Sequence, residues 1–132
     1  MLGSLEISAS GLEARRLWMN TIAENIANAE TTRDANGNPN PYVRKEPLFS
    51  TNKVGNAVGV RVLKVQDDPS PPREVFRPGH PDANPQGYVK MPNIRVVQEM
   101  VDMMMATRSY EANVTAMQAT KEMGSAAMRI LA

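Results

Sequence analysis

The residues best suited to catalysis or metal binding in this 132-residue chain lie in the stretch GHPDAN, residues 79–84. His80 is the only histidine, and Asp82 follows two positions later. A zinc site needs three or four such ligands, and a catalytic dyad needs a nucleophile held by a scaffold. One histidine and one aspartate beside Pro81 therefore predict a turn rather than a reactive site.

The other residues with chemical potential also favour structural interpretations. The chain has no cysteine, which excludes disulfides, thiolate metal sites and thiol nucleophiles. Asp67 and Asp68 precede Pro69 and are typical of a turn, and GNAVGV at 55–60 lacks the Lys-Ser/Thr ending of a phosphate loop. Fifteen basic against fourteen acidic residues argue against nucleic-acid binding through bulk charge. We expect no enzymatic activity, no cofactor, no metal and no nucleic-acid partner.

A cluster of methionines, Met100 with Met103 to Met105, allows three interpretations. Thioethers bind soft metals, and methionine-rich patches accept varied partners. Packing against neighbours in slightly different settings is the interpretation that we favour. No apolar run reaches the ~20 residues that span a bilayer, so we expect no direct membrane span. The N-terminus lacks the pattern of a cleaved signal peptide.

Proline divides the chain into three segments. All ten prolines lie between Pro39 and Pro92, and each would cost ~3 kcal/mol inside a helix. The sequence therefore predicts an N-terminal helix within 1–32, a segment 33–92 of short strands and extended loops, and a long C-terminal helix within 93–132. The expected fold is mainly α with a small β-rich insert, its two terminal helices packed as an antiparallel coiled-coil-like pair.

The N-terminal helix is predicted by a heptad repeat and by local caps. Its apolar stripe consists of Leu5, Leu12, Met19 and Ile26, with Ile22 and Ala29 between them. Ser10 with Glu13 forms a possible capping box, and Ser4 is an alternative cap. Further along, Asn36-Gly37 is typical of a hairpin turn. Val58, Val60 and Val62 alternate as in a strand, which could pair with residues 73–77, and residues 78–87 predict an irregular loop.

The C-terminal helix carries more apolar surface than one partner helix can cover. Asn93 is its expected N-cap. One stripe comprises Met100, Met103, Tyr110, Val114 and Met117, and a second comprises Val97, Val101, Met104 and Met105, continued by Ala112, Ala116, Ala119 and Met123. A helix over 94–131 would be ~57 Å long, whereas a globule of this chain length is roughly 36 Å across. We therefore expect other chains to cover the remaining surface.

Two stretches resemble the signatures of one protein family. SASGLEARRLWMNTIAENIANAETT at 8–32 is similar to the N-terminal motif of bacterial flagellar rod and hook proteins. GYVKMPNIRVVQEMVDMMMATRSYEANVTAMQATKEM at 87–123 is similar to their C-terminal motif, and members of the proximal rod are the most similar. Arg95 and Gln98 depart from the family pattern, which has Asn and Glu there.

The resemblance implies a structural role in the flagellar basal body. In the family, terminal helices form the inner layer of a hollow drive shaft that transmits torque and passes exported subunits, and the segment between them forms an outer layer. Members leave the cell through the flagellar type III export system without a cleaved signal and assemble in the periplasm. Expected partners are further copies, other rod proteins, and MS-ring and export-gate components. Alternatives are another short rod protein, or a helical adaptor that docks on one partner.

The residues that we expect to pack subunits together lie on both terminal helices. They are Leu5, Ser10, Gly11, Leu12, Met19, Ile22, Asn25, Ile26, Ala27, Asn28, Val97, Met100, Val101, Met104, Arg108, Tyr110, Asn113 and Met117.

Asn25 and Asn28 lie on one side of the first helix, where asparagine is a poor helix former. A buried carboxamide must be hydrogen-bonded and so can fix one helix register, as a single buried Asn does in coiled coils. The alternative is that Asn28 belongs only to the fraying end of the helix.

Overall fold

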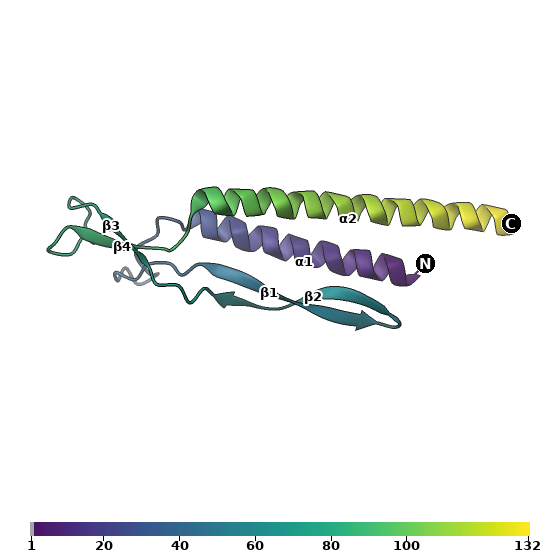
Figure 1. Cartoon of the computed structure of the whole chain (residues 1–132), viewed down its shortest axis with the longest axis horizontal. Coiled ribbons are helices and arrows are strands. Elements are labelled where there is room, and N and C mark those ends of the chain that lie inside the picture. The colour runs from purple at the N-terminus through teal and green to yellow at the C-terminus, as the bar shows by residue number, and fades with distance from the viewer. Residues whose placement is uncertain (1) are drawn as a thin grey trace.

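The computed structural model describes residues 2–132 as two long helices with two small β-hairpins between them. The elements are α1 (Leu2–Ala27), β1 (Lys45–Val54), β2 (Ala57–Asp67), β3 (Arg73–Phe76), β4 (Tyr88–Met91) and α2 (Val96–Leu131). Figure 1 shows an elongated molecule in which α1 and α2 run antiparallel, the β1–β2 hairpin follows the other side of α1, and β3–β4 lies beyond the start of α2. The predicted fold class, mainly α with a small β insert, is confirmed.

Helix α1 lies between α2 and the β1–β2 hairpin and is therefore covered on two sides. Ala14 and Ile22 are buried, and the polar Thr21 and Asn25 are buried beside them. Trp18 packs edge-on against Phe49 of β1, with ring centroids 6.1 Å apart. Side chains on more than one face of α1 thus leave water, and this burial stabilises a helix whose own propensity would be marginal.

Helix α2 contacts α1 through one stripe and extends past it. Three close approaches set the antiparallel register: a Cβ on Gly11 would lie 3.0 Å from Asn113, Thr107 Oγ1 lies 3.7 Å from Met19 Sδ, and Asn25 bonds to Glu99. At 1.5 Å per residue, the 26 residues of α1 span about 39 Å and the 36 of α2 about 54 Å. The last turns of α2 therefore have no α1 beside them (Figure 1).

The predicted helix caps are wrong, because tertiary packing outweighs a cap of about 1 kcal/mol. Helix α1 begins at Leu2, so neither Ser4 nor Ser10 caps it. Helix α2 begins at Val96, and its N-cap residue Arg95 makes no side-chain cap bond. Asn93 lies outside α2, because the chain is extended as it leaves β4 and buries the side chain of Ile94.

The predicted pairing of residues 58–62 with 73–77 is also wrong. Strand β2 pairs antiparallel with β1, around a tight turn in which Gly55 has a φ of 62°. Strand β3 pairs with β4 instead. The stretch between β2 and β3 contains three prolines, which suit an extended connection better than a hairpin turn. The Asn36-Gly37 turn does form, within the loop that joins α1 to β1, and residues 77–87 form the expected irregular loop.

Close packing of β2 on α1 depends on Gly59. A Cβ at this position would lie 2.6 Å from Ser10 Oγ, which donates a hydrogen bond to Ile7 O at 2.7 Å and accepts one from the Val60 N–H at 3.2 Å. Gly59→Ala forces the Ser10 hydroxyl to rotate away from these partners. We expect the free energy of unfolding, measured by urea denaturation, to fall by about 1–2 kcal/mol.

Gly79→Ala is the matched control, because nothing lies within 4 Å of the added methyl group. It should change stability by less than about 0.5 kcal/mol. Equal stabilities of the two variants would contradict the proposed contact between Gly59 and Ser10.

Candidate functional site

Asn25 is buried where the end of α1, the start of β1 and the first turn of α2 meet. Its side chain is 1% exposed. Its Nδ2 donates to Lys45 O at 2.8 Å and to Glu99 Oε2 at 3.3 Å, while its Oδ1 accepts the Lys45 N–H at 2.9 Å. One carboxamide thus pairs both backbone groups of Lys45 and also reaches α2, which leaves α1 a single register against its two neighbours.

Glu99 supplies the charge at this meeting point. Its side chain is 1% exposed, and its Oε1 accepts a hydrogen bond from Arg44 Nε at 2.5 Å. Arg44 Nη1 lies 3.3 Å from Asp68 Oδ2. A buried carboxylate is costly unless it is paired and hydrogen-bonded, and Glu99 is both. We call Asn25, Arg44, Asp68 and Glu99 the helix junction.

The pKa values of Arg44 and Asp68 shift in the direction that keeps both side chains charged. Burial opposes the charge on Arg44, but hydrogen bonds and attraction from Glu99 and Asp68 outweigh it, and the pKa of Arg44 is raised. Hydrogen bonds from Ser70, with a smaller contribution from Arg44, lower the pKa of Asp68. The ion pair between Arg44 and Asp68 therefore stays intact over the neutral range.

Asn28 does not share the role of Asn25. Its Nδ2 donates to Glu24 O at 2.9 Å, and its Oδ1 accepts from Thr31 Oγ1 at 3.1 Å. Helix α1 has already ended at Ala27. Asn28 therefore belongs to the closing turn of the helix, the alternative that the sequence left open.

The predicted packing residues fall into three groups by exposure. Ile22 and Asn25 are buried, and Ala27 is exposed. Half-buried positions are Leu5, Ser10, Gly11, Leu12, Met19, Ile26, Asn28, Tyr110, Asn113 and Met117. Exposed positions on α2 are Val97, Met100, Val101, Met104 and Arg108. Most of the buried and half-buried positions lie where α1 packs against α2 or the β1–β2 hairpin.

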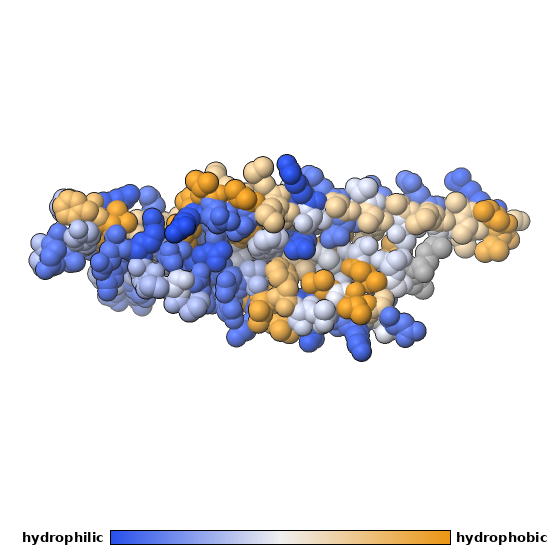
Figure 2. Space-filling view, in the orientation of Figure 1, coloured by the Kyte–Doolittle hydropathy of each residue, from blue (hydrophilic) through white to orange (hydrophobic). Residues whose placement is uncertain are grey.

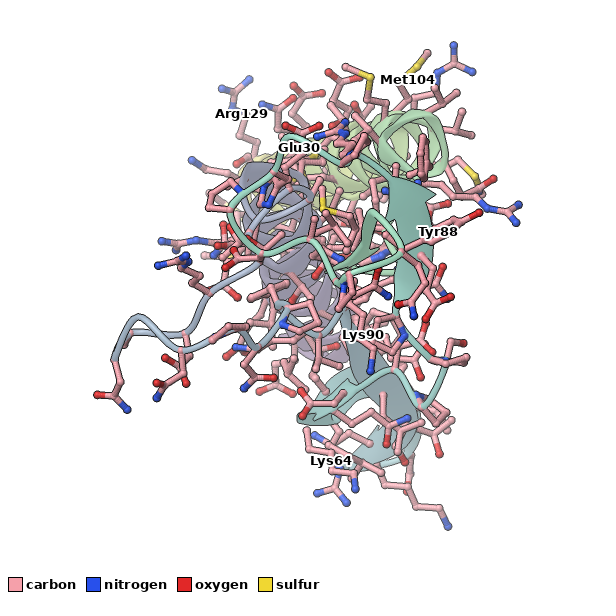
Figure 3. All side chains as sticks on the ribbon, turned by 90° about the vertical axis from the view of Figure 1, so that its left-hand side faces the viewer. Glu30, Lys64, Tyr88, Lys90, Met104 and Arg129 are labelled. Atoms are coloured by element: carbon pink, nitrogen blue, oxygen red, sulfur yellow. The ribbon has the colours of Figure 1, made fainter. Side chains whose placement is uncertain are left out.

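Four of these exposed positions are apolar and, with Met105, form a surface on α2 that no other segment of residues 2–132 fully covers. We call Val97, Met100, Val101, Met104 and Met105 the outer face of α2. Val97 is 75% exposed and Met104 is 58% exposed. Figure 2 shows this hydrophobic surface over the first turns of α2, and more at its C-terminal end and on the β1–β2 hairpin. Figure 3 shows Met104 pointing away from the body of the molecule, on the side opposite to Lys64 of the hairpin.

The stretch with His80 and Asp82 forms a second polar cluster, in the loop between β3 and β4. Asp82 pairs with Arg33 Nη2 at 2.8 Å and accepts from Thr32 Oγ1 at 2.8 Å, and these bonds lower its pKa. His80 Nδ1 accepts the Asp82 N–H at 3.1 Å. Within residues 2–132, no three His, Asp or Glu side chains are placed to hold a metal ion. The cluster thus ties the loop to the segment after α1.

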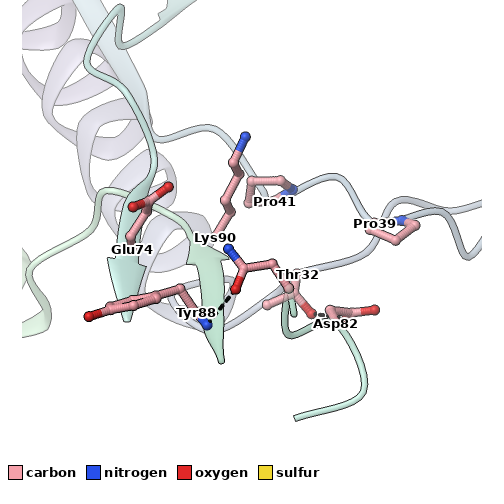
Figure 4. A pocket seen from close by; sticks show the side chains of 8 residues that line it. Thr32, Pro39, Pro41, Glu74, Asp82, Tyr88 and Lys90 are labelled. Carbon is pink, nitrogen blue, oxygen red and sulfur yellow. Dashed lines mark hydrogen bonds between the residues drawn. The ribbon is translucent and has the colours of Figure 1, made fainter. Parts of the chain in front are cut away.

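A cavity of about 150 Å³ lies beside this cluster (Figure 4). It is lined by Thr32, Pro39, Pro41, Glu74, Asp82, Asn84, Tyr88 and Lys90. Glu74 and Lys90 face each other across the β3–β4 pair, and Asn84 Oδ1 accepts the Tyr88 N–H at 2.8 Å. At the opposite wall Thr32 Oγ1 donates to Asp82 Oδ2 at 2.8 Å.

Sequence reasoning missed Arg44 and Glu99, although one signal was available for Glu99. The positions 99, 103, 106, 110, 113 and 117 follow helical spacing, and this is the stripe that faces α1. A charged residue on a buried stripe indicates a charged partner. Met100, predicted on the same stripe as Met103, is 55% exposed and lies on the outer face instead.

Comparison with known proteins gives a consistent result along the chain. A family model described as flagella basal body rod protein matches residues 5–33, and one described as flagellar basal body rod FlgEFG protein C-terminal matches residues 86–130. Among the described helices, none is long and apolar enough to cross a membrane.

Curated relatives match over nearly their full length. The chain is 42% identical to the flagellar basal-body rod protein FlgC of Bacillus subtilis, over 96% of this chain and 95% of that protein. It is 37% identical to FlgC of Borreliella burgdorferi, over 99% and 97%. It is 40% identical to FlgC of Escherichia coli O6:H1, over 93% and 92%.

Asn25→Leu tests the helix junction. The variant leaves the N–H and C=O of Lys45 without their side-chain partner and removes one donor from Glu99. We expect a loss of about 2–5 kcal/mol in the free energy of unfolding, measured by urea denaturation. Asn28→Leu, where water replaces the lost bonds, should cost less than about 1 kcal/mol, so equal losses would argue against the junction.

Acid should weaken the tie between the loop and the segment after α1. Because the folded pKa of Asp82 lies below its unfolded value, the unfolded chain binds the proton first. The stabilisation is complete above about pH 4 and is lost as the pH falls through the lower folded pKa. In thermal melts between about pH 5 and pH 2, Asp82→Asn should lose less stability than the parent chain. An identical acid dependence would refute this assignment.

Proposed function

This chain belongs to the FlgC family of flagellar basal-body rod proteins and is a structural subunit of the proximal rod, and we propose that it polymerises through its two terminal helices into the wall of a hollow shaft. As a rod subunit it assembles with other components of the flagellar basal body. In the proposal, α1 and α2 form the inner layer, and residues 33–92 form the outer layer.

The outer face of α2 is the observation that carries this proposal. Val97, Met100, Val101, Met104 and Met105 are each between 45% and 75% exposed, on one continuous surface of the helix. Contiguous apolar surface of this kind is uncommon on monomeric proteins and marks interaction sites. Beyond the end of α1, Ile130 and Leu131 are 84% exposed. Neighbouring subunits packed along α2 would remove all of this surface from water.

The β1–β2 hairpin supports a second set of contacts on the outside. Val58 is 56% exposed and Leu63 is 51% exposed, on the side of α1 that faces away from α2. A subunit with apolar surface on two opposite sides can contact neighbours within a wall and the structures that surround it. The helix junction, which holds the hairpin and both helices in one arrangement, would pass torque from the inner to the outer layer.

The finer partners and the route of export are part of the proposal. We infer contacts with further copies and other rod proteins along the shaft, and with MS-ring and export-gate components at its base. The family resemblance supports assembly in the periplasm after type III export without a cleaved signal. We further infer that the subunit is not an enzyme, because its best-placed reactive groups are engaged in structural bonds. The Asp82 carboxylate accepts from Thr32 and Arg33, and His80 Nδ1 accepts the Asp82 N–H.

A helical adaptor that docks on one partner is the competing proposal. It needs one apolar surface, whereas this chain exposes apolar surface on α2, at its C-terminal end and on the hairpin. Several surfaces favour an assembly in which each subunit has several neighbours.

Val101→Asp tests the role of the outer face. Because Val101 is exposed in the single subunit, the variant should keep the helix content and change the free energy of unfolding by less than about 0.5 kcal/mol. A buried aspartate at a subunit contact is costly, so swimming and the recovery of rods from cells should be lost.

Gln86→Asp is the matched control, since Gln86 is exposed in the loop before β4 and lies outside both apolar surfaces. It introduces the same side chain and should leave swimming intact. Normal swimming of the Val101→Asp strain would rule out polymerisation through the outer face.

A further inference from the structure

Two exposed stretches of α2 have the same spacing of residues, but one carries large side chains and the other carries small ones. Val97, Val101 and Met104 form a ridge with intervals of four and three residues, and we call them the α2 ridge. Ala112, Ala116 and Ala119 repeat these intervals fifteen residues later, and we call them the alanine stripe. All six positions are exposed. Large side chains on one stretch and methyl groups on the other are complementary in shape.

We propose that the α2 ridge of one copy packs on the alanine stripe of the next copy, with the two α2 helices parallel and offset by fifteen residues. The offset corresponds to about 22 Å along the helix axis. This inference rests on the proposed function and specifies which surfaces of two copies meet. Alanine lets the backbones approach closely, so that the valines and the methionine fill the space beside it.

The charges beside the two stretches agree with this offset. Arg108 continues the α2 ridge by the next interval of four, and Glu122 lies beside the alanine stripe fourteen residues further on. Both are exposed, and neither forms an ion pair with another residue in the described part of the chain. An offset of fifteen places Arg108 of one copy opposite Met123 of the other, one residue from Glu122. The same register therefore pairs the shapes and places the opposite charges near each other.

An antiparallel arrangement of two α2 helices also brings ridge and stripe together, but it conflicts with Arg108. In that arrangement Val97 faces Ala119 and Met104 faces Ala112, so the twofold axis passes close to position 108. Two copies of Arg108 would then lie side by side, and like charges at the centre of a contact are unfavourable. The charges favour the parallel arrangement.

A single parallel offset contact leaves one copy with a free stripe and the other copy with a free ridge. Such a head-to-tail interface does not close on itself and adds copies in one direction. The chain thus carries both halves of its own repeating contact on a single helix.

Cysteine crosslinking in cells tests the register, because the natural sequence has no cysteine. In Met104→Cys/Ala119→Cys, the two cysteines are about 22 Å apart in one helix, too far for a disulfide within the chain. In assembled rods they face each other between copies. Mild oxidation should therefore convert the monomer band into a ladder of covalent multimers on a non-reducing gel.

Val97→Cys/Ala119→Cys is the matched control and shares one cysteine with the test pair. It should stay monomeric, and multimers from this pair instead of the test pair would establish the antiparallel arrangement and overturn the inference. Absence of crosslinks from both pairs in swimming cells would also overturn it, while leaving the proposed function intact.

Exchange of charge gives a second measurement on the same register. Arg108→Glu and Glu122→Arg should each reduce swimming and rod recovery, and the double variant should restore both. A double variant no better than the single variants would count against the pairing of these two residues.

Discussion

The buried carboxylate of Glu99 is the interaction on which the arrangement of the whole subunit depends. It lies on α2, accepts a hydrogen bond from Arg44 just before β1 and another from Asn25 near the end of α1. Removing a carboxylate from water is unfavourable unless all its partners are present. The three segments therefore reach their positions together, and a shift of any one of them leaves a buried charge or amide without a partner.

This constraint fixes the arrangement of the elements at one end of the molecule, whereas apolar surface stays exposed along the rest of α2. The helix junction holds both helices and the hairpin at the start of α2, but α2 continues beyond α1 and presents its outer face to water (Figure 1). Apolar contacts have little directional preference, whereas the junction and the charges of Arg108 and Glu122 do. In our proposal, polar groups set the geometry, and the apolar surface supplies most of the free energy of assembly.

Elements were predictable where one physical effect dominated over a long stretch. The absence of proline and the heptad spacing placed both helices, and the turn residues placed the loop of His80. Caps and strand partners were not, because each depends on a contact distant in sequence. Ser10 does not cap α1, because the helix begins earlier, at Leu2, and packs on the hairpin. Strand β2 pairs with β1 through a turn at Gly55. Asn25 stood out as an unusual residue, yet its partners at Lys45 and Glu99 lie 20 and 74 positions away.

The sequence by itself determined the two helices, the irregular middle, the family, and the excess of apolar surface over what one chain can cover. The family follows from the resemblance of residues 8–32 and 87–123 to known signatures. The other three properties follow from composition and periodicity, which act locally and add along the chain. Only the tertiary structure decided which stripe of α2 faces α1, which strands pair, and that Glu99 rather than Asn28 completes the junction with Asn25. The reason is that a buried polar group selects its partner by position in space, and that position exists only once the distant segments have folded against each other.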